Sequence, residues 1–293
     1  MNYRHAFHAA NFADVVKHAA LALLVERLKE KDTAFAALDL FAGAGVYDLE
    51  DAAARKTAEA EGGLFRLWPP PRIGPEGELG ALLAPWLGVV AALNGGALGR
   101  RPRLYPGSPE LLRRLLRPQD RLVLAELQPD EAAALKRRYA RDPQVAVHLR
   151  DGFEALPALV PPEERRGLVL LDPPFEQPDE PERLVRALRR AWRRWPTGIY
   201  LLWYPLKDPA DSGAWLEALR AGATRPLLQA EITLFDALPA WRLNGCGLLL
   251  LNPPWRFEAT LAALLGRLQP LLSRGGGSAR VGWLAAGEAS AGT

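Results

Sequence analysis

The chain of 293 residues has a single cysteine, Cys246, so it can form neither an intramolecular disulfide nor a zinc site built on cysteines. It lacks an uninterrupted apolar run of membrane-spanning length, and its opening, MNYRHAFHAANFADVVKH, is too polar for a signal peptide. That opening holds three of the four histidines, yet it has no cysteine or carboxylate at metal-ligand spacing. These absences predict a cytoplasmic protein without a membrane partner or a bound metal.

The composition that remains is that of an ordinary globular protein. Hydrophobic residues make up 49% of the chain and charged residues 24%, which is ample for a large core. The formal charge of +3 is compatible with a nucleic-acid partner but does not demand one. The length allows one large α/β domain with an insertion, or two domains.

Strand-like and helical segments alternate along most of the chain. Strand-like runs occur at 33–41, 121–127, 144–149, 167–172, 199–203, 228–235 and 247–251, and helical patterns at 13–29, 130–141, 180–195 and 215–221. This alternation predicts an α/β fold with a doubly wound, mostly parallel, seven-stranded sheet. Residues 50–104 are rich in proline and glycine and predict an inserted helical subdomain, which leaves 1–49 and 105–293 as the core.

The most informative motif is Asp172-Pro-Pro-Phe175, which closes the apolar run 167–171. A carboxylate and a backbone carbonyl can each accept one hydrogen of an amino group on a planar ring, and so draw its nitrogen toward a tetrahedral shape. Pro173 stiffens the turn, and Phe175 can stack on an extruded base. Asp172, Pro173 and Phe175 are therefore candidate catalytic residues. The alternative is a simple turn, since the chain has 26 prolines.

Three other predicted strands end in residues that suit a nucleoside ligand. The first strand leads into a glycine turn, where the backbone can approach a ligand closely. An acid after the second strand can hold both hydroxyls of a ribose, and an Asp-Gly pair follows the third. Each feature alone is as readily a turn, but their order places them at one edge of the sheet. The residues expected to bind a cofactor there are Asp39, Phe41, Gly43, Gly45, Glu126, Asp151 and Gly152.

Two further segments suit anionic groups. The segment Tyr-Pro-Gly-Ser108-Pro109 predicts a helix start, with Ser108 as the N-cap and Pro109 as the first helical residue. The N-terminus of such a helix attracts a carboxylate. Lys17 and His18 also suit an anionic group, and Tyr3 suits base stacking. Capping alone would explain Ser108 equally well.

A second Pro-Pro motif and two groups of arginines complete the candidates. Asn252-Pro-Pro-Trp255 fits the same amino-methylation pattern but follows the last predicted strand, so we interpret it as a strand-terminating turn. The arginines that could bind RNA are Arg100, Arg101, Arg103, Arg183, Arg186, Arg189, Arg190, Arg193 and Arg194. We favour the insertion and the N-terminal segment as the RNA-binding surface, because both lie nearer the predicted active edge. The arginines of 180–195 fit a solvated helix face.

Together these motifs resemble the J-type 23S ribosomal RNA adenine-N6 methyltransferase family. The resemblance rests on YRHAFHA, NFADVVKH, LDLFAGAG, YPGSP, AEL, DGF, LLDPPF, LWYP and NPPW, and covers essentially the whole chain. It implies a class I methyltransferase fold, S-adenosylmethionine as cofactor, and 23S RNA as substrate, either naked or in an early assembly intermediate. The family often has His at the position of Phe41, and its usual aromatic at the position of Phe175 is Tyr.

The resemblance also implies roles for individual residues. Asp172 would accept the proton, and Lys17 would support the cofactor site. The further cofactor-binding residues implied are His18, Ser108, Glu126, Asp151, Gly152 and Asp172, and the RNA-binding residues are Tyr3, Arg4, His5 and Phe175.

Three alternatives remain open on the sequence. The substrate could be DNA adenine; a protein glutamine is disfavoured because that chemistry usually goes with Asn at the position of Asp172. A non-catalytic RNA-binding module on the same fold is the third. We expect a monomer without an obligate protein partner, because no coiled-coil or extended apolar pattern is present.

Overall fold

The computed structural model describes residues 8–68, 77–96, 101–207, 209–236 and 243–285. The strands are β1 (Ala36–Asp39), β2 (Val46–Asp48), β3 (Leu104–Pro106), β4 (Arg121–Glu126), β5 (Val145–Leu149), β6 (Gly167–Leu171), β7 (Ile199–Leu206), β8 (Leu227–Thr233), β9 (Gly245–Leu251) and β10 (Ala279–Ala285). The helices are α1 (Phe12–Lys29), α2 (Ala52–Thr57), α3 (Glu78–Leu93), α4 (Ser108–Leu115), α5 (Pro129–Arg138), α6 (Gly152–Leu159), α7 (Glu180–Arg194), α8 (Pro209–Ala221) and α9 (Phe257–Leu272), with two 3-10 turns, η2 (Glu59–Gly62) and η3 (Leu64–Leu67).

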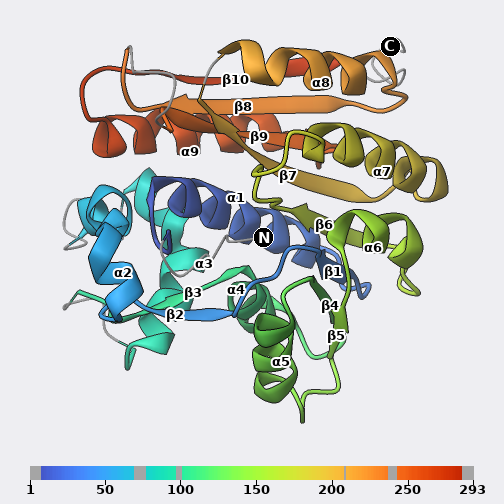
Figure 1. Cartoon of the computed structure of the whole chain (residues 1–293), viewed down its shortest axis with the longest axis horizontal. Coiled ribbons are helices and arrows are strands. Elements are labelled where there is room, and N and C mark those ends of the chain that lie inside the picture. The colour runs from blue at the N-terminus through green and yellow to red at the C-terminus, as the bar shows by residue number, and fades with distance from the viewer. Residues whose placement is uncertain (1–7, 69–76, 97–100, 208, 237–242, 286–293) are drawn as a thin grey trace.

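One sheet of eight strands, in the order β10-β8-β9-β7-β6-β1-β4-β5, runs through the molecule (Figure 1). Strands β5, β4, β1, β6 and β7 are parallel, whereas β9 pairs antiparallel with β7 and β8, and β10 antiparallel with β8. The prediction of a doubly wound, mostly parallel α/β fold is confirmed. The predicted count of seven strands was wrong, because the half-exposed segment Ala279–Ala285 adds an edge strand whose pattern gave no strand signal.

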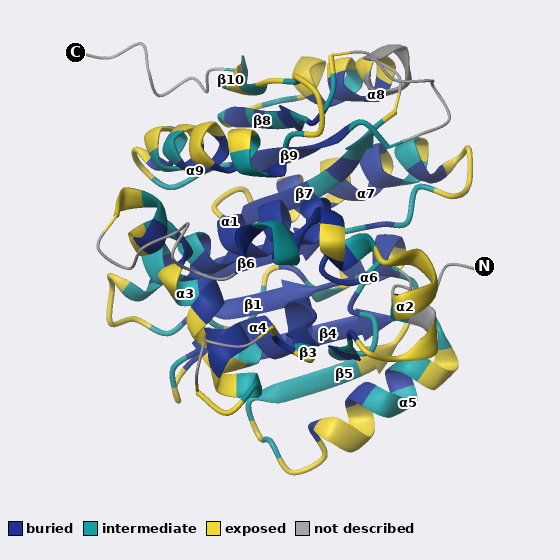
Figure 2. Ribbon diagram, turned by 90° about the vertical axis from the view of Figure 1, so that its left-hand side faces the viewer, coloured by how far each residue is buried: buried dark blue, intermediate teal, exposed yellow. Residues whose placement is uncertain are grey.

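Helices cover both faces of the sheet, and each face has its own hydrophobic core. Side chains of α1, α3, α4, α5 and α9 pack on one face, and those of α6, α7 and α8 on the other. All five residues of β6 are buried, which explains its uninterrupted apolar sequence. Figure 2 shows this burial in the central strands, while β5 at the edge is only partly covered. Because β1, β4, β5 and β6 are parallel, their carboxyl ends meet at one edge of the sheet.

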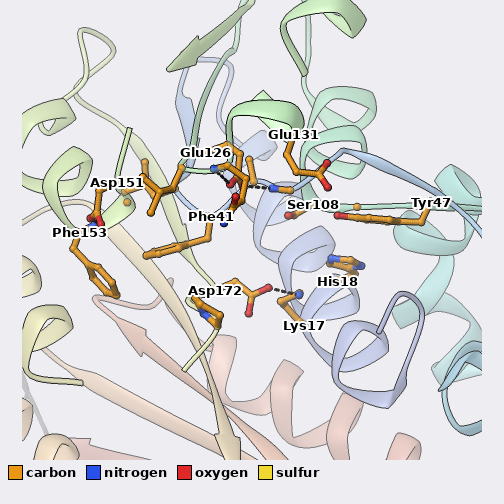
Figure 3. A pocket seen from close by; sticks show the side chains of 18 of the residues that line it. Lys17, His18, Phe41, Tyr47, Ser108, Glu126, Glu131, Asp151, Phe153 and Asp172 are labelled. Atoms are coloured by element: carbon orange, nitrogen blue, oxygen red, sulfur yellow. Dashed lines mark hydrogen bonds and ion pairs between the residues drawn. The ribbon is translucent and has the colours of Figure 1, made fainter. Parts of the chain in front are cut away.

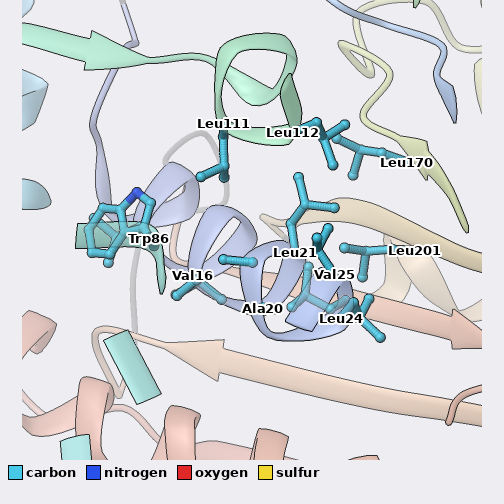
Figure 4. Close-up of a cluster of buried hydrophobic side chains, with 14 of the residues drawn as sticks. Val16, Ala20, Leu21, Leu24, Val25, Trp86, Leu111, Leu112, Leu170 and Leu201 are labelled. Carbon is cyan, nitrogen blue, oxygen red and sulfur yellow. The ribbon is translucent and has the colours of Figure 1, made fainter. Parts of the chain in front are cut away.

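Helix α1 lies inside the protein rather than on its surface. It is buried along most of its length, and Figure 4 shows Val16, Leu21 and Leu24 among side chains of α3, α4, β6 and β7. Because the first half of the helix is enclosed, its polar side chains there are buried too. Asp14, Lys17 and His18 are 1 to 3% exposed, and α1 thus carries charged groups to the carboxyl edge of the sheet. Among the described residues, no helix combines the length and the apolar character needed to cross a membrane.

The insertion predicted at 50–104 is mainly helical where it is described, and a small two-stranded antiparallel sheet lies at its two ends. Strand β2 pairs antiparallel with β3, so the two ends of the segment lie side by side. Trp86 of α3 is fully buried and contacts Tyr105 edge-on, with ring centroids 6.5 Å apart. Helix α3 packs against α1, α4 and α9. We propose that 50–104 is an insertion in sequence that folds as one unit with the core.

Replacement of Trp86 tests this shared core. Trp86→Ala leaves a cavity against α1 and Tyr105, so we expect a loss of about 3–5 kcal/mol in the free energy of unfolding, within a single transition in urea. Trp255→Ala is the matched control, because Trp255 is 79% exposed and should change stability little. Two separate transitions in the wild type would contradict a shared core.

Candidate active site

A cavity of about 860 Å³, including the open space at its mouth, lies at the carboxyl edge of the sheet. Its walls come from the ends of β1, β4 and β6 and from the first turns of α1, α4 and α6 (Figure 3). We call it the first cavity. The predicted cofactor residues that line it are Lys17, His18, Phe41, Gly43, Ser108, Glu126, Asp151, Gly152 and Asp172.

Asp39 and Gly45, also predicted to bind a cofactor, do not line this cavity. Asp39 is fully buried beneath the glycine turn, where its Oδ1 accepts a hydrogen bond from the Phe41 N–H. The carbonyl of Gly45 accepts from the Gly107 N–H at 2.8 Å, with φ at +88°. Both residues lie behind the loop and support it, while residues 40–43 between them line the cavity.

Glu126 and Gly43 are tied together on the wall. The Gly43 N–H donates to Glu126 Oε2 and the Gln128 N–H to Oε1, each at 2.7 Å. Each carboxylate oxygen keeps a lone pair for a ligand. Gly43 has φ at +63°, and an added Cβ would lie 2.4 Å from the Tyr47 hydroxyl, so any other residue would be strained there. Tyr47 also lines the cavity. Sequence reasoning missed it, because it lies in the short strand β2, which no pattern predicted.

The opposite wall is aromatic. Phe41 and Phe153 meet edge to face at 5.1 Å, and an added Cβ on Gly152 would lie 2.3 Å from the Leu40 carbonyl. Gly152 thus lets α6 press against the loop after β1. Asp151 is the N-cap of α6, as its Oδ1 accepts from the N–H groups of the two residues after Gly152.

Ser108 lies at the N-terminus of α4, but the predicted capping role is wrong. Gly107 is the N-cap, since its carbonyl accepts from the Leu111 N–H, and no side chain caps this helix. Ser108 is the first helical residue and Pro109 the second. The serine hydroxyl is therefore not engaged in capping and faces the cavity beside His18, whose ring Nδ1 lies 2.8 Å from the Tyr105 hydroxyl.

At the floor of the cavity, a buried lysine bridges two carboxylates. Lys17 Nζ donates to Asp14 Oδ1 at 2.8 Å and to Asp172 Oδ2 at 2.5 Å. Burial lowers the pKa of Lys17, but the two carboxylates outweigh it and raise the pKa above its usual value. Asp172 Oδ1 accepts no hydrogen bond from the described residues. Sequence reasoning missed Asp14, which carries no signal besides lying one helical turn before Lys17.

A second, wider cavity of about 1680 Å³ including open space lies on the other side of this pair. It is lined by Asp172, Pro173 and Phe175, together with Trp203. Lys17 and Asp172 line both cavities, so the ion pair stands where the two meet. Phe175 packs edge-on against Trp203, with centroids 6.2 Å apart. The arrangement can hold two ligands that face each other across one carboxylate.

The backbone that carries this motif is held by a buried acid. Glu180 is 1% exposed, and its Oε2 accepts from the Glu176 N–H at 3.1 Å. Burial raises the pKa of Glu180, although this hydrogen bond and those from neighbouring backbone N–H groups favour the ionised form. Phe175 has a positive φ of 51°, which an aromatic residue rarely adopts. Glu180 thus stabilises an unusual turn that presents Phe175 to the second cavity.

Known proteins of similar sequence decide the family. A family model described as "Ribosomal RNA large subunit methyltransferase D, RlmJ" matches residues 32–285. The chain belongs to the RlmJ family. Two relatives named ribosomal RNA large subunit methyltransferase J cover 97% of this chain and 99% of their own length: that of Escherichia coli K12 is 38% identical, and that of Haemophilus influenzae 35%.

A solved structure supports the assignment to the RlmJ family. A Legionella pneumophila protein of known crystal structure is 32% identical and superposes with a TM-score of 0.84, covering 96% of this chain and 99% of that one. The resemblance seen in the sequence motifs is therefore confirmed, and it extends through the insertion.

The second Pro-Pro motif of this RlmJ-family chain lies at the opposite edge of the sheet. Because β9 runs antiparallel to β7, its end faces the start of β7, where Asn252 donates to the Thr197 carbonyl at 3.0 Å. Trp255 is 79% exposed there, and its carbonyl accepts from Arg27. Asn252 and Trp255 take no part in either cavity.

The predicted RNA-binding residues divide into three groups. Tyr3, Arg4, His5 and Arg100 lie outside the described residues. Arg101 pairs with Glu61 and Arg103 with Asp48, so both arginines of the insertion are engaged in surface ion pairs. On α7, only Arg183 reaches the first cavity; the Arg194 Nε donates to the Val160 carbonyl at the far end of α6.

Asp39 is an unusual carboxyl group behind the first cavity. Among the described residues, no group donates a hydrogen bond to its Oδ2. Burial raises the pKa of Asp39 to about 7, although the nearby Ser108 side chain and the Phe41 N–H favour the ionised form. The carboxyl is therefore half protonated near neutral pH.

Asp39→Asn tests this pKa through the pH dependence of stability. Because the folded-state pKa lies above the usual 3.8, the native state binds an extra proton between these values. The stabilising contribution is complete below about pH 4 and is lost as pH rises through about 7. From urea unfolding at about pH 5 and about pH 8, we expect the wild type to lose stability relative to Asp39→Asn at the higher pH. An equal difference at both pH values would contradict a raised pKa.

Proposed function

We propose that the protein transfers a methyl group from S-adenosylmethionine to the exocyclic N6 amine of a flipped-out adenine in 23S ribosomal RNA. The observation that carries the proposal is the Lys17–Asp172 pair, which stands where two cavities meet. The first cavity has the carboxylates, the glycine turn and the apolar face that suit a nucleoside. The second has a carboxylate, a proline-stiffened turn and aromatic side chains.

The residues of the first cavity fit S-adenosylmethionine. Glu126 has lone pairs for both ribose hydroxyls, and Gly43 lines the cavity without a side chain, which allows a ligand to approach the loop closely. Ser108, at the N-terminus of α4, suits the cofactor's carboxylate. Phe41 supplies an apolar face for the purine. When bound, the cofactor supplies an electrophilic methyl group.

The residues of the second cavity fit an adenine amine. Asp172 Oδ1 and the Pro173 carbonyl would each accept one amino hydrogen, which turns the nitrogen lone pair toward the first cavity. Lys17 holds the Asp172 carboxylate in place through the ion pair. Asp172 would take the proton once positive charge develops on nitrogen, when even a weak base suffices. Phe175 would stack on the base, which must leave its helix to enter the cavity.

Free 23S RNA or an early assembly intermediate suits this site best, because an extruded base needs an accessible strand. We propose that Tyr3, Arg4 and His5, which precede α1, contact this RNA. Such an enzyme would act in the cytoplasm as a monomer, without an obligate protein partner.

Asp172→Asn tests the function. Asn keeps the shape but cannot accept the proton, so we expect the rate of methyl transfer to fall roughly 10²–10⁴-fold while S-adenosylmethionine still binds. The assay follows transfer to deproteinised 23S RNA, with an adenine-containing DNA duplex and a glutamine peptide in parallel. Mass mapping of the RNA should locate the methyl group on an adenine.

Trp255→Ala is the control for this assay, because its Pro-Pro motif lies at the opposite edge of the sheet. It should methylate RNA at the wild-type rate. Undiminished transfer by Asp172→Asn would refute the mechanism, and preferential methylation of the DNA or the peptide would refute the substrate.

A further inference from the structure

Arg183 differs from the other arginines of α7 because its guanidinium reaches the first cavity. It comes from the first turn of that helix, and Nη2 donates to Asp151 Oδ2 at 2.7 Å. Its Cζ lies 4.5 Å from the centroid of the Phe153 ring, a cation–π distance. The side chain is 31% exposed. The guanidinium therefore completes the cavity wall beside α6 instead of projecting into solvent.

This contact holds Asp151 Oδ2, the carboxylate oxygen that does not cap α6. Asp151 Oδ1 accepts from the N–H groups of Phe153 and Glu154, so that oxygen is committed to α6. Oδ2 accepts from Arg183 and keeps one lone pair. Gly152 packs so closely against the Leu40 carbonyl that an added Cβ would lie 2.3 Å from it, and this contact helps to fix the backbone next to Asp151. With both oxygens held, the free lone pair of Oδ2 has a defined direction at the cavity wall.

We propose that Arg183 is a positioning residue for the cofactor: it orients Asp151 so that Oδ2 accepts from the exocyclic amine of the purine. The inference rests on the proposed function, since it assumes a nucleoside cofactor in the first cavity. It makes Arg183 a determinant of specificity for a 6-amino purine over a 6-oxo purine, whose oxygen would face a carboxylate without a donor. Sites built to hydrogen-bond an amine reject analogues that lack it.

The other role open to Arg183 is a phosphate contact on a basic helix face. Its neighbour Arg186 has the features of a residue on such a face. Its side chain is 67% exposed, and its Nη1 comes no closer than 3.8 Å to Glu182 Oε2. Arg183 has its hydrogen bond and its ring contact on the side of Asp151 and Phe153. The geometry thus favours the cofactor side over the RNA side.

The test compares two nucleoside ligands in Arg183→Met, with Arg186→Met as the matched control. Calorimetry measures the dissociation constants of S-adenosylhomocysteine and of S-inosylhomocysteine, its 6-oxo analogue. We expect the wild type and Arg186→Met to prefer the adenosyl compound, and Arg183→Met to lose roughly tenfold or more of that preference, as for a hydrogen bond to a charged group. Asp151→Asn should lose it too, with no further loss in the double variant.

The ratio of the two affinities separates positioning from a merely structural role. An equal weakening of both ligands in Arg183→Met, or an unchanged ratio, would overturn the role of Arg183 while the proposed function stands. If the wild-type protein bound neither ligand, the cofactor assignment would fall, and the inference with it. No methyl transfer is needed for any of these readings.

Discussion

The ammonium group of Lys17, held between the carboxylates of Asp14 and Asp172, is the interaction on which the rest of the site depends. A lone charge at such depth would be expensive, and a pair or triad is tolerated only with good geometry and full hydrogen bonding. Here the lysine has a partner on each side. Asp172 is consequently fixed by a helix of the N-terminal segment.

That interaction requires the unusual position of α1. A helix on the surface could not deliver a buried lysine to the end of β6, so α1 is enclosed by the sheet, α3 and α4. The insertion contributes to this enclosure through α3, which explains why its largest buried side chain packs beside α1. Asp39, a third carboxyl group near the pair, is accommodated because burial raises its pKa to about 7 and leaves it partly neutral.

The parts of the site that sequence reasoning predicted are those encoded locally. Asp172, Glu126 and Gly152 each end a strand or open a helix, and the parallel sheet brings such positions to one edge. Residue chemistry alone suggested a ribose contact for Glu126 and a contact of Asp172 with an amino group on a planar ring. The role of Asp172 as proton acceptor and the RNA substrate came from the resemblance. The family is now established, while the individual roles stay predictions.

The parts that were missed depend on contacts between distant segments. Lys17 and Asp172 are 155 residues apart in the chain, so no local pattern indicated their pairing or the place of Asp14. Arg183 was grouped with a solvated helix face because charge periodicity does not reveal which arginine sits at the rim of a cavity. The capping role of Ser108 failed for a related reason: Gly107, tied to Gly45, takes the cap position instead.

A double-mutant cycle on the buried pair tests the central claim most directly. Single-turnover methyl transfer to 23S RNA, at saturating cofactor, is measured for Lys17→Met, Asp172→Asn and the double variant. If Lys17 acts by holding Asp172, its loss has no further consequence once that carboxylate is gone, and the double variant is no slower than Asp172→Asn alone. Losses that multiply would show that the two residues act independently, and would contradict the account.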